Sequence, residues 1–85
     1  LDGTPPLPAR WHREWARDFQ RAYEAFCAQV DAGRETAIDP YAAEAPEEFF
    51  AVVTEYHFSA PSLLAEAMPE VAAHLARFYG PPPAL

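Results

Sequence analysis

Apolar residues recur every three or four positions between residues 11 and 30, and this spacing constrains the fold more than any other feature. The apolar positions of the stretch are Trp11, Trp15, Phe19, Ala22, Tyr23, Phe26, Cys27 and Val30. Because residues three and four apart lie on one face of an α-helix, the pattern predicts a helix from Ala9 to about Ala32. We expect Gly33 to end this helix as a C-terminal cap.

Prolines mark the beginnings of the later helices, because proline fits the first turn of a helix but not its interior. Residues 33–45 contain Pro40 and show no sustained period, so we expect a loop with a short turn. Pro46 predicts a second helix that runs to about Phe58. Its start lacks a side-chain cap, because Ala45 has no hydrogen-bonding group to offer the free backbone donors.

Two shorter helices are expected in the C-terminal third of the chain. Ser59 is a suitable N-cap for a helix that begins near Pro61, and Pro69 opens a last helix that ends at Gly80. The chain is therefore predicted to be an all-α bundle of about four helices, without strands. Its predicted parts are an extended lead-in at residues 1–8, a single helical domain at residues 9–80 and a proline-rich tail at residues 81–85.

The charge balance and the single cysteine restrict the partners and the compartment. Six Lys and Arg against 13 Asp and Glu give a formal charge of −7, which opposes binding to phosphate backbones and to anionic membrane surfaces. No apolar run approaches the roughly 20 residues that a membrane span requires. Cys27 has no partner for an internal disulfide. We expect neither nucleic acid nor a membrane as a partner, and a cytoplasmic location.

The segment from residue 39 to residue 58, DPYAAEAPEEFFAVVTEYHF, contains residue choices that amphipathic packing does not explain. It resembles the Mlc titration factor A family, zinc peptidases related in their catalytic part to the anthrax lethal factor protease. That family carries a similar run of a tyrosine, Ala-Ala, a proline, Glu-Phe-Phe-Ala-Val and then Ser-Glu-Tyr with further aromatics. The resemblance continues through the segments PPLP, FCAQVDAG, APSLL, MPE and RFYG-Pro.

The resemblance implies that part of a metal site lies outside these 85 residues. Upstream of PPLP the family places a helix with HExxH, whose histidines bind zinc and whose glutamate activates water. This sequence contains no HExxH, and none of its three histidines has another histidine four positions away. We therefore expect a C-terminal fragment of a lethal-factor-like, zincin-type peptidase (a gluzincin), which would be inactive by itself and would not bind zinc tightly.

The resemblance also implies roles for three residues. Glu48 matches the third zinc ligand, and a site with two histidines and one glutamate leaves a position open for water or substrate. Tyr41 matches a tyrosine that donates a hydrogen bond to the oxyanion formed when water attacks the peptide carbonyl. Glu55, seven residues after Glu48, matches a glutamate that could accept a hydrogen bond from a zinc-binding histidine and fix its tautomer.

Each of these residues also has an ordinary structural interpretation. Glu48 would complement the positive end of the helix dipole in the first turn of its helix. Tyr41 would be a half-buried loop tyrosine, and Glu55 would be a solvated surface carboxylate. Glu47 points about 100° away from Glu48 on a helix and is expected to be solvated.

The remaining candidate metal ligands are not predicted to bind metal. His57 stands where the family has an aromatic residue, so we expect it to pack or to be exposed. His12 and His74 are expected on the surfaces of their helices. Cys27 lies on the core-facing side of its helix and is expected to pack as a small apolar group.

The function implied by the resemblance is peptide-bond hydrolysis by the intact zinc enzyme, on a peptide or protein substrate. A regulatory partner is implied as well, the glucose-responsive repressor Mlc. Two alternatives need no catalysis by these residues: a small acidic helical module that binds a protein partner, and a helical subdomain that supports the protease. Aromatic residues surround the helix at residues 46–58, so an isolated fragment is expected to self-associate.

Overall fold

The computed structural model describes residues 9–82, with side chains described from residue 12 onward. Its elements are α1 (Ala9–Asp31), the 3-10 turn η1 (Pro40–Ala43), α2 (Pro46–Ser59), α3 (Pro61–Ala67) and α4 (Pro69–Tyr79). No strand occurs in this part of the chain, so the predicted all-α class is confirmed. The lead-in at residues 1–8, the tail residues 83–85 and the side chain of Trp11 lie outside the described residues.

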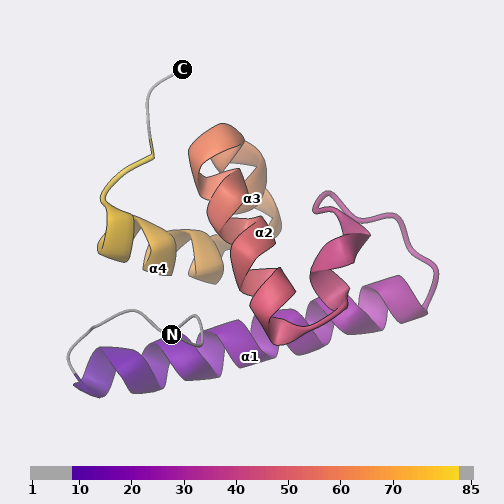
Figure 1. Cartoon of the computed structure of the whole chain (residues 1–85), viewed down its shortest axis with the longest axis horizontal. Helices are drawn as coiled ribbons and strands as arrows, with labels where there is room; N and C mark the ends of the chain where they lie inside the picture. The colour runs from indigo at the N-terminus through magenta and orange to yellow at the C-terminus, as the bar shows by residue number, and fades with distance from the viewer. Residues whose placement is uncertain (1–8, 83–85) are drawn as a thin grey trace.

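Helix α1 is the long base on which the other elements rest. In Figure 1, α2 rises from the middle of α1, α3 lies beside α2, and α4 lies over the N-terminal half of α1. Helix α4 contacts all three of the other helices, whereas η1 contacts α1 and α2. Among residues 9–82, no helix is both long and apolar enough to cross a bilayer. The arrangement places η1 and the first turn of α2 together against α1.

The end of α1 is confirmed to be a glycine cap. Gly33 has a φ of 75°, which glycine adopts without a Cβ clash. The Gly33 N–H donates to the carbonyl of Val30, and the Arg34 N–H donates to the carbonyl of Gln29, both at 3.0 Å. These two bonds form a Schellman motif, which satisfies carbonyls that the end of a helix leaves free.

A single residue separates α2 from α3, and another separates α3 from α4. Ala60 and Met68 each end one helix and begin the next, and a proline follows each of them. Because a residue before proline is disfavoured in the helical conformation, the chain changes direction there without a longer loop. The prediction that Ser59 caps α3 was wrong. Ser59 is the last residue of α2, and its hydroxyl donates to the carbonyl of Glu55 at 2.9 Å.

The core draws on every helix, on η1 and on the loop before it. Its buried apolar residues are Trp15, Phe19, Phe26, Ile38, Ala42, Phe49, Val53, Leu64, Val71 and Leu75. Phe49, in the first turn of α2, lies among three rings of α1. Its ring centroid is 6.1 Å from Phe19, 5.5 Å from Tyr23 and 6.1 Å from Phe26. This cluster fixes the start of α2 on α1.

Replacing Phe49 with alanine should therefore cost far more stability than the same change at Phe58 in the same helix. Phe49 is 2% exposed and Phe58 is 44% exposed. We expect Phe49→Ala to lower the free energy of unfolding by about 3–5 kcal/mol, and Phe58→Ala to lower it by about 1 kcal/mol or less. Urea denaturation followed by circular dichroism measures both. Equal losses would contradict this account of the core.

His74 is not on the surface of its helix, so that prediction was wrong. His74 is 6% exposed, because it lies three residues after Val71 on the buried face of α4. Its Nε2 lies 2.8 Å from Oδ2 of Asp18, and its ring meets the Trp15 ring edge-on at 5.7 Å. The other carboxylate oxygen of Asp18 accepts a bond from Nε of Arg17 at 3.0 Å. The buried histidine thus joins α4 to α1.

Asp18 should make the stability of the chain sensitive to acid. Hydrogen bonds from Arg17 and then from His74 lower the pKa of Asp18 below its usual 3.8. A lowered pKa in the folded state means that the stabilisation is present above pH 3.8 and is lost as pH falls through the folded-state pKa. We expect Asp18→Asn to cost about 1–3 kcal/mol at pH 7.

The free energy of unfolding of Asp18→Asn should differ less from that of the wild type in acid. Urea denaturation of both proteins between pH 7 and pH 3 measures this difference. Stabilisation by the charge starts to fall as the pH drops below about 3.8 and is lost below the lowered pKa of folded Asp18, where the wild-type carboxyl is also neutral, so the two stabilities should approach each other. A constant difference across this range would show that the charge of Asp18 does not contribute.

Candidate functional site

The structure brings Tyr41 and Glu48 together. Tyr41 is in η1 and its side chain is 54% exposed, whereas Glu48 is half-buried in the first turn of α2. The Tyr41 phenol lies within reach of the Glu48 carboxylate, so that a hydrogen bond between the two side chains favours the protonated phenol. That bond raises the pKa of Tyr41 above its usual 10.0, and the charges of Glu48 and Glu44 act in the same direction. The phenol therefore stays protonated at neutral pH and able to donate.

The backbone around Tyr41 is held by a capped turn. Asp39 precedes Pro40 and acts as the N-cap of η1, where its Oδ1 accepts a bond from the Tyr41 N–H at 3.0 Å. The carbonyl of Tyr41 accepts a bond from the Glu44 N–H at 3.0 Å. The Asp39 N–H donates to the hydroxyl of Tyr56, on α2, at 3.2 Å. The turn thus has a defined conformation although the Tyr41 side chain is exposed.

Two side chains of α1 fasten the C-terminal end of this turn. The Tyr23 hydroxyl donates to the carbonyl of Ala43 at 3.3 Å, and Sγ of Cys27 lies 3.8 Å from the same oxygen. Tyr23 and Cys27 are four residues apart and therefore share one face of α1. Between Tyr41 and Ala43, Ala42 is completely buried. Cys27 is half-buried, so it is a weak donor in addition to a small packing group.

Negative charge surrounds the contact between Tyr41 and Glu48. Glu44 raises the pKa of Tyr41. The pKa of Tyr23 is raised as well, first by the neighbouring Cys27 side chain, with smaller contributions from Glu47 and Glu44. Glu47 is exposed, as the sequence predicted. No group of three His, Cys, Asp or Glu side chains among the described residues could hold a metal ion. The described residues therefore place negative charge near Tyr41 but form no group that could enclose a cation.

Glu55 lies on α2, two helical turns after Glu48, and is exposed. It is not among the groups that shift the pKa of Tyr41. His57 is 2% exposed and packs against Phe58 and Tyr79, with ring centroids 4.8 Å and 5.8 Å away. Its Nε2 has no hydrogen-bond partner among the described residues. The sequence had predicted packing or exposure for this histidine, and the structure shows packing.

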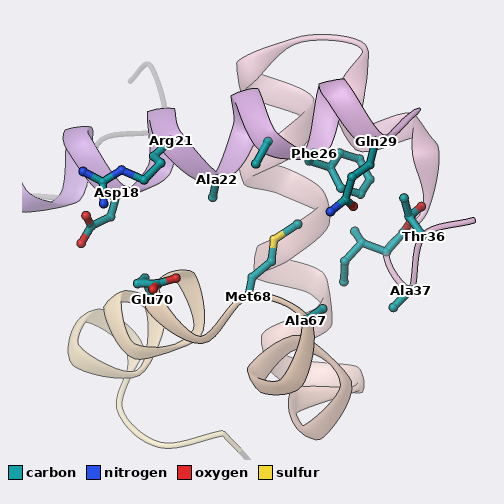
Figure 2. A pocket seen from close by; sticks show the side chains of 12 residues that line it. Asp18, Arg21, Ala22, Phe26, Gln29, Thr36, Ala37, Ala67, Met68 and Glu70 are labelled. Atoms are coloured by element: carbon teal, nitrogen blue, oxygen red, sulfur yellow. The ribbon is translucent and has the colours of Figure 1, made fainter. Parts of the chain in front are cut away.

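A cavity of about 240 Å³ lies on another side of the molecule. Its lining residues include Asp18 and Phe26 on α1, Ile38 in the loop, Met68 between α3 and α4, and Glu70 on α4 (Figure 2). Neither Tyr41 nor Glu48 lines it. The candidate site, an exposed Tyr41 beside a half-buried Glu48, is therefore not part of this cavity.

Comparison with known proteins identifies the family. The family model described as the glucose-regulated metallo-peptidase M90 matches residues 1–80. The chain belongs to this family. M90 proteins are metallopeptidases by that description, so the chain is part of a family of metal-dependent enzymes. No solved structure matches the chain.

Curated relatives in the M90 family carry the name Mlc titration factor A. The chain is 49% identical to the protein from Edwardsiella ictaluri and 46% identical to that from Serratia proteamaculans, each over 91% of this chain and 30% of the relative. It is 42% identical to the protein from Escherichia fergusonii over 98% of this chain and 32% of the relative. The chain thus spans about a third of the length of these relatives. The sequence-based family assignment is confirmed.

Sequence reasoning missed the anchors that hold the candidate site in this chain. Tyr23 and Cys27 had been assigned only to the apolar face of α1, although both carry donor groups. Their spacing of four residues was a usable signal, because it places two donors on one helical face. Asp39 before Pro40 was a second signal, because this pair is typical of a capped turn. The pairing of Tyr23 with Ala43 joins segments 20 residues apart and could not be read from local pattern.

Proposed function

We propose that this chain forms the part of a zinc peptidase that contributes Glu48 as a metal ligand and Tyr41 as a hydrogen-bond donor to the reacting carbonyl. The observation that carries the proposal is the contact between the Tyr41 phenol and the Glu48 carboxylate. An oxyanion donor has to act close to the metal-bound reaction centre, and these two side chains are adjacent. Membership in a metallopeptidase family supports the same conclusion.

The chemistry of Glu48 suits a zinc ligand. A carboxylate oxygen is a common donor to zinc, and one position on zinc is left open in sites with three protein ligands. No ion pair ties Glu48 to a cationic side chain of the described residues, so its lone pairs remain available apart from the bond that Tyr41 donates. Nearby Glu44 adds negative charge that favours a cation.

One carboxylate does not make a zinc site, so the other ligands have to come from residues beyond this chain. The described residues hold no cluster that could complete it. The family resemblance supplies the remaining ligands as the two histidines of an HExxH helix. Zinc, when bound, lowers the pKa of its water ligand and polarises the scissile carbonyl. We therefore propose that the 85-residue chain alone is inactive and binds zinc only weakly.

Tyr41 and Glu55 would act on different parts of this centre. The exposed Tyr41 phenol is a neutral donor that can reach a substrate carbonyl and stabilise the negative charge that develops on its oxygen. Glu55 is exposed on α2, two turns after Glu48. It could accept a hydrogen bond from a zinc-binding histidine and so fix the tautomer of that histidine. Both roles require the metal-binding histidines of the whole protein.

The proposed substrate is a peptide or a protein, and the proposed location is the cytoplasm. The relatives are named for the titration of Mlc, so a regulatory link to the repressor Mlc is proposed for this chain as well. The described surface does not distinguish a docking face for that partner, so the proposal concerns the whole protein.

The metal role of Glu48 can be tested with Glu48→Gln in the whole protein that carries this chain. Glutamine keeps the size of the side chain but removes the negative charge that binds zinc. We expect the zinc dissociation constant to rise by about 100-fold or more, since even changes to residues that only support metal ligands cost about 10- to 100-fold. A competition titration against a chelator of known zinc affinity measures this.

The matched control is Glu47→Gln, which removes the same charge from the neighbouring, exposed position. Its zinc affinity should stay within about 3-fold of the wild type, because it keeps all ligands and loses only a screened surface charge. Equal effects of the two variants would mean that Glu48 acts through the local field and is not a ligand. If neither variant changes zinc affinity, the alternative of a protein-binding module without metal chemistry would be favoured.

The role of Tyr41 can be tested with Tyr41→Phe, assayed on a fluorogenic peptide that the whole wild-type protein cleaves. Loss of an oxyanion donor should lower kcat by about 100- to 1000-fold, while zinc affinity stays unchanged. Tyr79→Phe is the control, because Tyr79 is a similarly exposed tyrosine at the end of α4. A Tyr41→Phe enzyme with normal kcat would remove Tyr41 from the mechanism.

A further inference from the structure

We infer that Tyr23 is a positioning residue for the Tyr41–Glu48 pair, a proposal that rests on the function proposed above. Tyr23 lies on α1 and touches both segments that carry the pair. Its hydroxyl holds the carbonyl of Ala43, two residues after Tyr41, at 3.3 Å. Its ring packs against Phe49, the neighbour of Glu48, at a centroid distance of 5.5 Å.

The two contacts of Tyr23 act on different members of the pair. The ring contact belongs to the aromatic cluster that docks the first turn of α2, so it positions the backbone of Glu48. The hydroxyl contact belongs to η1, so it positions the backbone of Tyr41. Because both contacts originate on one helix, Tyr23 ties the C-terminal end of η1 and the first turn of α2 to the same part of α1.

The remaining bonds of η1 show why the Ala43 contact matters. The N-terminal end of the turn is fixed by the bonds at Asp39, one of them to Tyr56 on α2. Those bonds do not fix the C-terminal end of the turn to α1. At that end, the donors on Ala43 are the Tyr23 hydroxyl and the weaker thiol of Cys27. Removing the hydroxyl should therefore let the Tyr41 side chain move relative to Glu48.

The length of the bond determines the size of the expected effect. At 3.3 Å it exceeds the preferred O–H···O distance of about 2.7–2.8 Å, so it is a weak hydrogen bond. A neutral hydrogen bond contributes a net free energy that corresponds to about a 2- to 12-fold change in an equilibrium constant. We expect a loss of kcat in the lower part of this range, well below the loss predicted for removing the Tyr41 phenol itself.

Tyr23→Phe in the whole zinc-loaded protein separates the two contacts, because it removes the hydroxyl and keeps the ring against Phe49. We expect kcat to fall by about 3- to 5-fold, with KM and the zinc dissociation constant within about 2-fold of the wild type. A variant that merely destabilised the fold would lower zinc affinity as well. Ser59→Ala is the control, since it removes another hydroxyl that donates to a backbone carbonyl, far from η1.

A double-mutant cycle with Tyr41→Phe completes the test. If Tyr23 acts through Tyr41, the double variant should have the kcat of Tyr41→Phe alone. Multiplicative losses, an unchanged kcat in Tyr23→Phe, or a parallel loss of zinc affinity would each overturn the positioning role. A normal kcat in Tyr41→Phe would instead contradict the proposed function. Failure of the positioning role and failure of the proposed function would therefore give different results.

Discussion

The packing of Phe49 on α1 is the contact on which the rest of this structure depends. It buries a large ring among Phe19, Tyr23 and Phe26 and so fixes the first turn of α2 against a 23-residue helix. Helix α2 starts without a side-chain cap, at Ala45, so this tertiary contact replaces the local stabilisation that a capping residue would supply. Glu48 is adjacent to Phe49 in sequence and is held half-buried at the edge of the cluster.

The candidate site combines an exposed side chain with a restrained backbone. Tyr41 is more than half exposed, yet the turn that carries it is bonded to the Asp39 side chain, to Tyr56 on α2 and to Tyr23 on α1. Such an arrangement lets a phenol face a substrate without a large cost of ordering when the substrate binds. The surrounding carboxylates add a negative potential that suits a cation. We propose that the chain provides one side of a metal centre and the support that positions it.

Local patterns predicted most of the fold, because helices leave a strong periodic signal and prolines mark their starts. The long helix, the glycine cap after it and the helices at Pro46 and Pro69 follow from spacing and from turn chemistry. The prediction for His74 failed because its burial depends on tertiary contacts. His74 has a half-buried partner, Asp18, 56 residues away, and a contact between residues so far apart leaves no local pattern. The residues of the candidate site came from a family resemblance, whereas their contact and the Tyr23 anchor are features of the folded chain.

The central claim is that Glu48 binds the metal while Tyr41 stands beside it. A crystal structure of the metal-loaded whole protein, with anomalous scattering recorded at the zinc edge, tests it most directly. The account predicts an anomalous peak about 2.0–2.2 Å from a carboxylate oxygen of Glu48, with the Tyr41 hydroxyl nearby but not bound to the metal. A zinc ion coordinated without Glu48, with that carboxylate bonded only to protein groups, would contradict it.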